Sequence, residues 1–208
     1  MLFADWLTVV VVGWLVIIVP GPNMLIVFRN TLSHSRQAGV LTAIGLAAGN
    51  LVHITYCLIG IGVLISQSIM LFNIVKLAGA VYLIYLGVKS LQAQPRTVDI
   101  DKNVLPDLTE LAAIRTGFLT DLLNPKATLF FLALFTQIIR PGTTISARIG
   151  YGLTIVALEF ILLTGLACVI GQPCVRRQFD AVSHWIERVT GVVLIGLGLR
   201  VAFARGIR

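Results

Sequence analysis

Charged side chains are scarce in this chain of 208 residues, where Asp, Glu, Lys and Arg together make up 12%. A soluble domain carries about 25% charged residues, so half that share cannot cover a globule of this size with polar surface. Hydrophobic residues make up 57% instead. The composition predicts an integral membrane protein and excludes a cytosolic enzyme, a secreted disulfide scaffold and a disordered chain.

Cysteine is also rare, and the sequence motifs of several enzyme classes are absent. The three cysteines form no C-x-x-C pair and have no histidine at metal-ligand spacing, so we expect free thiols that behave as small apolar residues. Neither G-x-S-x-G nor H-E-x-x-H occurs, and no Walker A or G-x-G-x-x-G motif is found. We therefore expect no enzyme and no cofactor or metal, and any pumping should draw on an ion gradient rather than on ATP.

Gaps between the charges divide the chain into six apolar spans, each long enough to cross a bilayer, which takes about 20 residues. No Lys or Arg precedes Arg29, which argues against a signal peptide and for a retained first helix. The expected transmembrane helices are 6–28, 37–65, 70–91, 114–139, 146–171 and 183–204. The polar linker 92–113 separates a first repeat (1–91) from a second repeat (114–208) within one membrane domain.

The net charge of +7 would suit nucleic-acid binding in a soluble protein. Here the basic residues lie mainly between apolar runs, so we interpret them as topology signals and contacts to anionic lipid headgroups, with no nucleic-acid partner. In the six-span arrangement nine basic residues fall on the face of the 92–113 linker and six on the other face. This bias predicts that the linker lies in the cytoplasm.

Three spans on each side of the linker would insert the two halves in opposite orientations, as in the inverted repeats of transporters. Each half opens with a span interrupted by proline and asparagine and closes with a similar string framed by glycines, although apolar helices can resemble each other by chance. The interruptions are Pro20-Gly21-Pro22-Asn23 and Asn124-Pro125-Lys126. We expect an all-α membrane protein of six transmembrane helices in two inverted three-helix repeats, with the first and fourth helices broken at these motifs.

Proline inside a helix frees carbonyl groups, which must find partners within the protein when lipid surrounds the helix. The carbonyls concerned are those of Val16, Ile18 and Asp121. Two kinks that serve packing would fit the pattern. Two discontinuous helices would also fit, and their new N-termini near Asn23 and Lys126 would then bring partial positive charge to a cavity.

Ionisable side chains in the middle of a bilayer cost roughly 2.5–3.5 kcal/mol on insertion scales, so each should pair or face water. Asp121 and Lys126 face together only if Pro125 breaks their helix. They form either an internal ion pair or part of a transport site. Glu159 lies in a long uncharged stretch and must meet another helix, water or a proton, as a structural residue or as a proton-binding one.

Gly45, Gly49 and His53 follow one another at a spacing of four, so they share one face of the second span. The glycines predict close contact between helices, within the chain or across a homodimer. His53, near Asn50, is either a buried hydrogen-bonded histidine or a contact for substrate or proton.

Several strings together resemble the LysE/RhtB family of bacterial amino-acid exporters. They are Pro20-Gly21-Pro22-Asn23, the glycines of the second span, YLIYLG in the third and LLNPKA in the fourth. The resemblance covers nearly all of the chain and includes an acidic residue in the fifth span, here Glu159. It implies a multi-pass protein of the bacterial cytoplasmic membrane that couples protons to the efflux of amino acids such as homoserine, threonine, leucine or lysine. Asp121 departs from the family pattern, which has a neutral polar residue there, often Asn.

The site hypothesis follows from the charges of an amino acid zwitterion. Its carboxylate would lie at the new helix N-termini, and its ammonium would lie on an acidic side chain or on freed carbonyls. The predicted substrate-binding residues are Pro20, Gly21, Pro22, Asn23, Asn50, His53, Asn124, Pro125 and Lys126. The predicted proton-coupling residues are Glu159 and Asp121.

Two other functions remain open from the residues alone. Asp121, Glu159 and His53 could be ligands in a membrane-embedded metal protein or enzyme, although no motif connects them. Two Asn-Pro breaks in inverted halves also resemble an aquaporin-like passive channel, although the Asn-Pro-Ala motif of that class is not matched twice.

Overall fold

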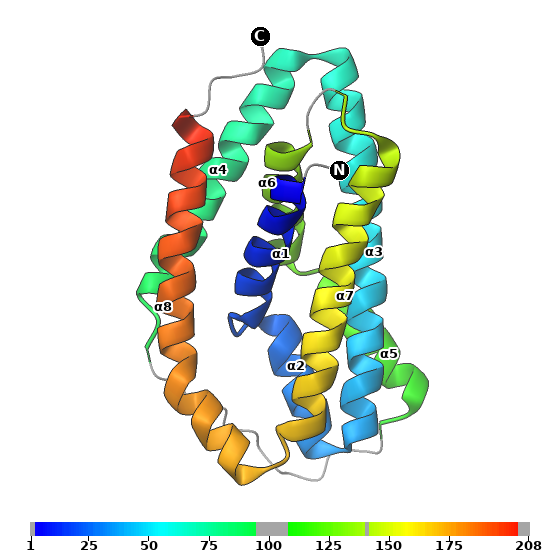
Figure 1. Cartoon of the computed structure of the whole chain (residues 1–208). Coiled ribbons are helices and arrows are strands. Elements are labelled where there is room, and N and C mark those ends of the chain that lie inside the picture. Colours follow the sequence, from blue (N-terminus) through cyan, green and yellow to red (C-terminus); the bar gives the residue numbers. More distant parts are fainter. Residues whose placement is uncertain (1–2, 95–107, 140–141, 204–208) are drawn as a thin grey trace.

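The computed structural model describes residues 3–94, 108–139 and 142–203 (Figure 1). These ranges contain eight α-helices and no strand. The helices are α1 Phe3–Ile18, α2 Pro22–Ser33, α3 Arg36–Gln67, α4 Ile69–Leu91, α5 Glu110–Leu122, α6 Pro125–Ile138, α7 Ile145–Val169 and α8 Pro173–Phe203. Most of the predicted linker 92–113 lies outside the described residues, as do Arg140, Pro141 and residue 204 of the predicted sixth helix.

Four of the helices, α3, α4, α7 and α8, each contain a stretch long and apolar enough to cross a bilayer. The pairs α1–α2 and α5–α6 pass the same test when each pair counts as one span, which brings the number to six. The pairs are bent by 54° and 56°. The chain is therefore an all-helical, multi-pass membrane protein.

The first predicted interruption is a true break between helices. α1 ends at Ile18, and α2 begins at Pro22 after an extended Gly21. Proline suits the first position of a helix because the N–H that it lacks would have no partner there. The prediction of a discontinuous helix is confirmed here, and a simple kink is excluded.

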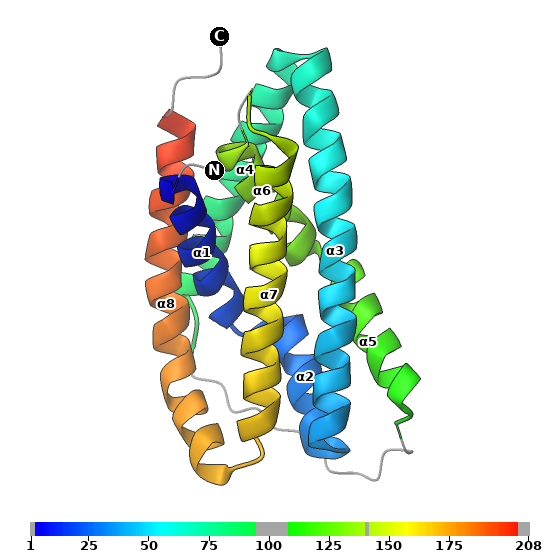
Figure 2. The same cartoon turned by 45° about the vertical axis from the view of Figure 1, so that its right-hand side comes forward.

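The second interruption has the same construction. α5 ends at Leu122, and α6 begins at Pro125. Asn124 caps α6, because its side-chain oxygen accepts the backbone N–H of Lys126 at 3.0 Å. Both views of the molecule place the two breaks at mid-height, with α1 and α6 on one side of that level and α2 and α5 on the other (Figures 1 and 2).

Three helices are longer than their apolar segments suggest. α3 spans 36–67 rather than 37–65, α8 begins at Pro173 rather than 183, and α5 begins at Glu110 rather than 114. The start of α5 is set by a polar cap, since the Thr109 hydroxyl accepts the N–H of Ala112 at 3.3 Å. The ends of these helices extend into polar sequence outside the apolar runs. Gaps between charges therefore could not predict where the helices begin and end.

The glycine face of α3 packs within the chain against α5. A Cβ atom added at Gly45 would collide with the carbonyl of Ile114, and one added at Gly117 would collide with that of Thr42. A Cβ atom at Gly49 would lie 2.7 Å from a carboxylate oxygen of Asp121. The predicted close helix contact is confirmed, and it uses this face inside one chain, so the face gives no support to a homodimer.

The apolar core lies on both sides of the breaks. On one side α6 contributes Phe131 and Phe135, which pack with Tyr151 of α7. On the other side Phe28 of α2 packs with Leu163 of α7. Between these two clusters the polar side chains of the breaks come together.

Candidate functional site

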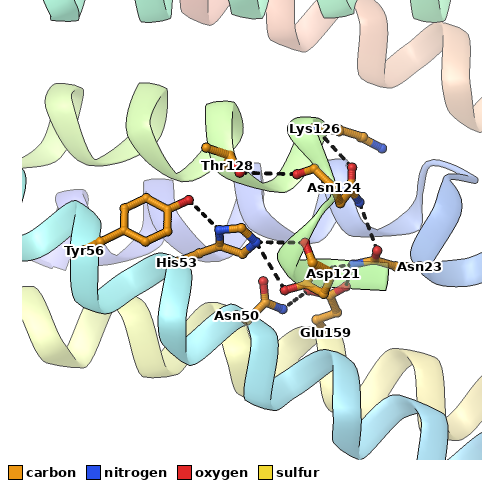
Figure 3. Close-up of polar contacts among 9 residues, drawn as sticks. All are labelled: Asn23, Asn50, His53, Tyr56, Asp121, Asn124, Lys126, Thr128 and Glu159. Atoms are coloured by element: carbon orange, nitrogen blue, oxygen red, sulfur yellow. Dashed lines mark hydrogen bonds and ion pairs between the residues drawn. The ribbon is translucent and has the colours of Figure 1, made fainter. Parts of the chain in front are cut away.

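Asn23 is the centre of a polar network that joins both helix breaks (Figure 3). Its Nδ2 group donates to Asp121 Oδ1 at 2.7 Å and to Glu159 Oε1 at 2.8 Å. Its Oδ1 atom accepts from Asn124 Nδ2 at 2.9 Å. One amide at the start of α2 therefore links the end of α5, the start of α6 and the middle of α7.

α3 adds three side chains to this network. Asn50 Nδ2 donates to the other carboxylate oxygen of Glu159, Oε2. His53 Nε2 lies 2.9 Å from the backbone oxygen of Asp121, and since a carbonyl only accepts, Nε2 carries the hydrogen. The other ring nitrogen of His53 then accepts from the Tyr56 hydroxyl. The sequence left two roles open for His53, and the structure places it 1% exposed and hydrogen-bonded.

Two of the carbonyls that the prolines were expected to free have partners, as lipid surroundings require. The carbonyl oxygens of Val16 and Val19 both lie 3.5 Å from Lys126 Nζ. The Asp121 carbonyl accepts from His53 and also from the Asn124 N–H at 2.9 Å. The ammonium of Lys126 thus lies at the C-terminal end of α1, where a helix carries partial negative charge.

Asp121 and Lys126, both among the described residues, do not form the internal ion pair that the sequence left open. The break at Pro125 directs the lysine side chain toward α1, while Asp121 stays beside α3 (Figure 3). The only ion-pair contact to Asp121 within the described ranges comes from His53, whose Nε2 lies 3.5 Å from Oδ2.

A cavity opens beside this network, with an empty volume of about 490 Å³ that includes its open mouth. Seven predicted site residues line it: Gly21, Pro22, Asn23, Asn50, Asn124, Lys126 and Glu159. The other four do not: Pro20 and Pro125 lie at the breaks, and His53 and Asp121 are buried, at 1% and 0% exposed.

The rest of the cavity wall is apolar and was missed by sequence reasoning. It consists of Val16, Ile17, Val19, Met24, Ala127, Phe130, Phe131, Ile155 and Leu163. These residues have the same types as lipid-facing and core residues, so only the rotation of each helix identifies them. Two signals were available: seven of these residues lie within about two turns of a predicted break, while Ile155 and Leu163 lie one helical turn either side of Glu159.

The described part of the chain holds no group of three His, Cys, Asp or Glu side chains that could bind a metal ion. Asp121 and Glu159 are instead joined through the amide of Asn23, which donates a hydrogen to each. The metal-binding alternative for Asp121, Glu159 and His53 has no support in this geometry.

The chain matches the LysE type translocator family over residues 14–205. It is similar to the uncharacterized membrane protein YrhP of Bacillus subtilis, at 30% identity over 89% of this chain and 92% of that protein. It is also similar to the uncharacterized membrane protein YahN of Escherichia coli K12 (29%; 88% and 82%) and to the threonine efflux protein of the same strain (26%; 96% and 98%). No solved structure matches it. The broken spans, the polar network and these similarities agree: the chain belongs to the LysE type translocator family.

Proposed function

We propose that this translocator exports amino acids across the bacterial cytoplasmic membrane in exchange for protons. The observation that carries the proposal is the presence of opposite charges in one cavity, which both Lys126 and Glu159 line. The threonine efflux protein of Escherichia coli is a relative over almost the full length of both chains. The charge bias of the loops supports a cytoplasmic linker 92–113.

An amino acid zwitterion matches the charges of this cavity. Its carboxylate suits Lys126 and the N-termini of α2 and α6, where N–H groups and helix dipoles attract anions. Its ammonium suits Glu159 and the carbonyls of Val16 and Val19 at the end of α1. Substrate would then replace contacts that Lys126 makes with these carbonyls in the described structure.

The apolar wall supports a neutral substrate side chain. Phe130, Phe131 and Leu163 face the cavity, and Glu159 is the sole acidic residue among those that line it. If Glu159 binds the α-ammonium, a second ammonium on the substrate would find no second carboxylate in the lining and would be repelled by Lys126. Leucine or threonine therefore fits better than lysine.

We also propose that the two halves are inverted repeats. Both halves open with a broken pair whose second helix has proline at its first position, and the bends differ by little, at 54° and 56°. Equivalent helices also pair, since α3 packs on α7 and α4 on α8, while α3 contacts α5 as α7 contacts α1. Superposition of residues 3–91 on 110–203 in an experimental structure tests this, and a poor match over the broken spans would contradict it.

The experiment for export uses purified protein in liposomes. Counterflow of labelled leucine, threonine, homoserine, lysine and cysteine is measured with and without an imposed pH gradient. We expect at least one neutral amino acid to move, and Lys126→Gln and Glu159→Gln to abolish the movement while remaining folded. Arg115→Gln and Glu110→Gln, both at exposed positions on α5, are the controls. Full transport by both cavity variants would contradict the proposal.

A further inference from the structure

Resting on that proposed function, we propose that the two carboxyl groups joined by Asn23 have separate tasks. Glu159 binds the ammonium of the substrate, and Asp121 carries the proton that is exchanged for it. Asn23 is the positioning residue that couples them, because its amide contacts both groups at once.

Access to the cavity separates the two carboxyl groups. Glu159 is part of the cavity lining. Asp121 is not, and it is 0% exposed. Its Oδ2 atom faces Gly49, where even an added Cβ atom would approach to 2.7 Å. A substrate can therefore reach Glu159 directly, whereas Asp121 has room only for something as small as a proton.

The hydrogen bonds of Glu159 and Asp121 also indicate that the two carboxyl groups have different tasks. Both oxygens of Glu159 accept from amide N–H groups, those of Asn23 and Asn50. Two donors on two oxygens are the environment of an ionised carboxylate, which only accepts. Asp121 accepts from Asn23 on Oδ1 alone, and its Oδ2 is buried without a hydrogen-bond partner. A bare charged oxygen is costly in an apolar interior, so Oδ2 is the atom suited to hold a proton.

A chain of polar groups reaches Asp121 from the side away from the cavity. His53 Nε2 lies 3.5 Å from Oδ2, and the other ring nitrogen of His53 meets the Tyr56 hydroxyl. Tyr56 is 40% exposed on the outer face of α3, within the stretch Arg36–Gly60 that can cross a bilayer, whereas His53 is 1% exposed. The titratable groups that face Asp121 are His53 and Tyr56 on α3 and Glu159 on α7, whereas the charge of Lys126 on α6 acts on Glu159. The structure assigns the proton a route through Tyr56 and His53 that does not cross the substrate cavity.

In this arrangement, binding of substrate at Glu159 disfavours the proton on Asp121. An ammonium that binds Glu159 competes with Asn23 for Oε1. Its positive charge also repels a proton on Asp121, the group at the other end of the same amide. Loading substrate therefore favours proton release, which is the sign that antiport requires.

The test separates exchange from coupled transport in liposomes, with labelled threonine and labelled leucine as two separate probes. Counterflow at equal pH needs substrate binding but no net proton movement, whereas accumulation driven by a pH gradient needs both. For Asp121→Asn we expect counterflow within about threefold of wild type and no gain from the gradient. For Glu159→Gln we expect loss of both. Equal loss of counterflow in the two variants, or gradient-driven accumulation by Asp121→Asn, would overturn the division of tasks.

The result for wild-type protein shows whether a failure concerns this inference or the proposed export function. If wild type moves neither probe, the proposed function fails for these amino acids, and the inference fails with it. If wild type moves a probe and only the variants disagree, export stands and the inference alone is lost.

Tyr56→Phe removes one hydroxyl, the partner of the second ring nitrogen of His53, and keeps the aromatic ring in place. We expect its gradient-driven rate to fall at least threefold while counterflow stays at the wild-type level. The matched control is Tyr85→Phe on α4, at a residue that is also exposed, from which we expect no change. A Tyr56→Phe protein with the wild-type gradient-driven rate would overturn the proton route.

Discussion

Replacing Asn23 by alanine removes one side chain that makes three hydrogen bonds at the helix breaks. Each bond contributes about 1 kcal/mol, and those to charged groups about 1.5–3 kcal/mol. Water from the adjoining cavity can replace part of this loss. We therefore expect the variant to be less stable by about 3 kcal/mol, on the order of the cost of leaving buried polar groups unpaired.

A shift of this size is measurable in detergent-purified protein. For a chain of about 200 residues, 1 kcal/mol corresponds to a Tm change of roughly 2–4 °C, so the apparent Tm of Asn23→Ala should fall by roughly 6–12 °C. Thr55→Ala is the control, because the Thr55 hydroxyl is exposed and bonds only to the carbonyl of Leu51 one turn away. An Asn23→Ala protein within 2 °C of wild type would refute the view that this amide holds the two broken spans together.

Three further predictions follow from the same contacts. Lys126→Met should weaken binding of labelled leucine at least tenfold, because the substrate carboxylate loses its cation. Lys126→Arg should recover part of the loss. Equal binding by wild type and both variants would contradict the carboxylate site. Gly117→Val should lower the apparent Tm, since overpacking costs about 1–3 kcal/mol and its Cβ would meet the Thr42 carbonyl, whereas Gly165→Ala, in open space, should change it little. Unlabelled leucine should compete with labelled threonine in counterflow at least tenfold better than lysine does, and better competition by lysine would refute the apolar wall as a selector.

The sequence predicted the breaks because proline and asparagine have few roles inside an apolar span. Pro22 and Pro125 both became first residues of helices, and the freed carbonyls of Val16 and Asp121 both found polar partners. The glycine spacing of α3 also predicted close packing, because small residues at i and i+4 share one face. These features depend on local chemistry, so the residues of a single segment are enough to predict them.

The sequence did not predict which side chains from distant parts of the chain would contact one another. Nothing in the pattern indicated that Asn23 would bridge Asp121 and Glu159, which lie 98 and 136 positions away. Lys126 was expected to face a cavity or Asp121, and its contact with the end of α1 depends on how two broken spans cross. The apolar wall escaped detection for a related reason, since helix rotation rather than residue type decides which apolar side chains face the cavity.

Proton movement driven by an amino acid tests the central claim most directly. Liposomes that contain the protein and a pH-sensitive dye are loaded with leucine or threonine and diluted into buffer without it. Exchange of substrate for protons predicts acidification of the interior as the amino acid leaves, which Glu159→Gln should abolish. Release of the labelled amino acid with no change in internal pH would contradict proton antiport, and no release at all by folded wild-type protein would contradict amino-acid export.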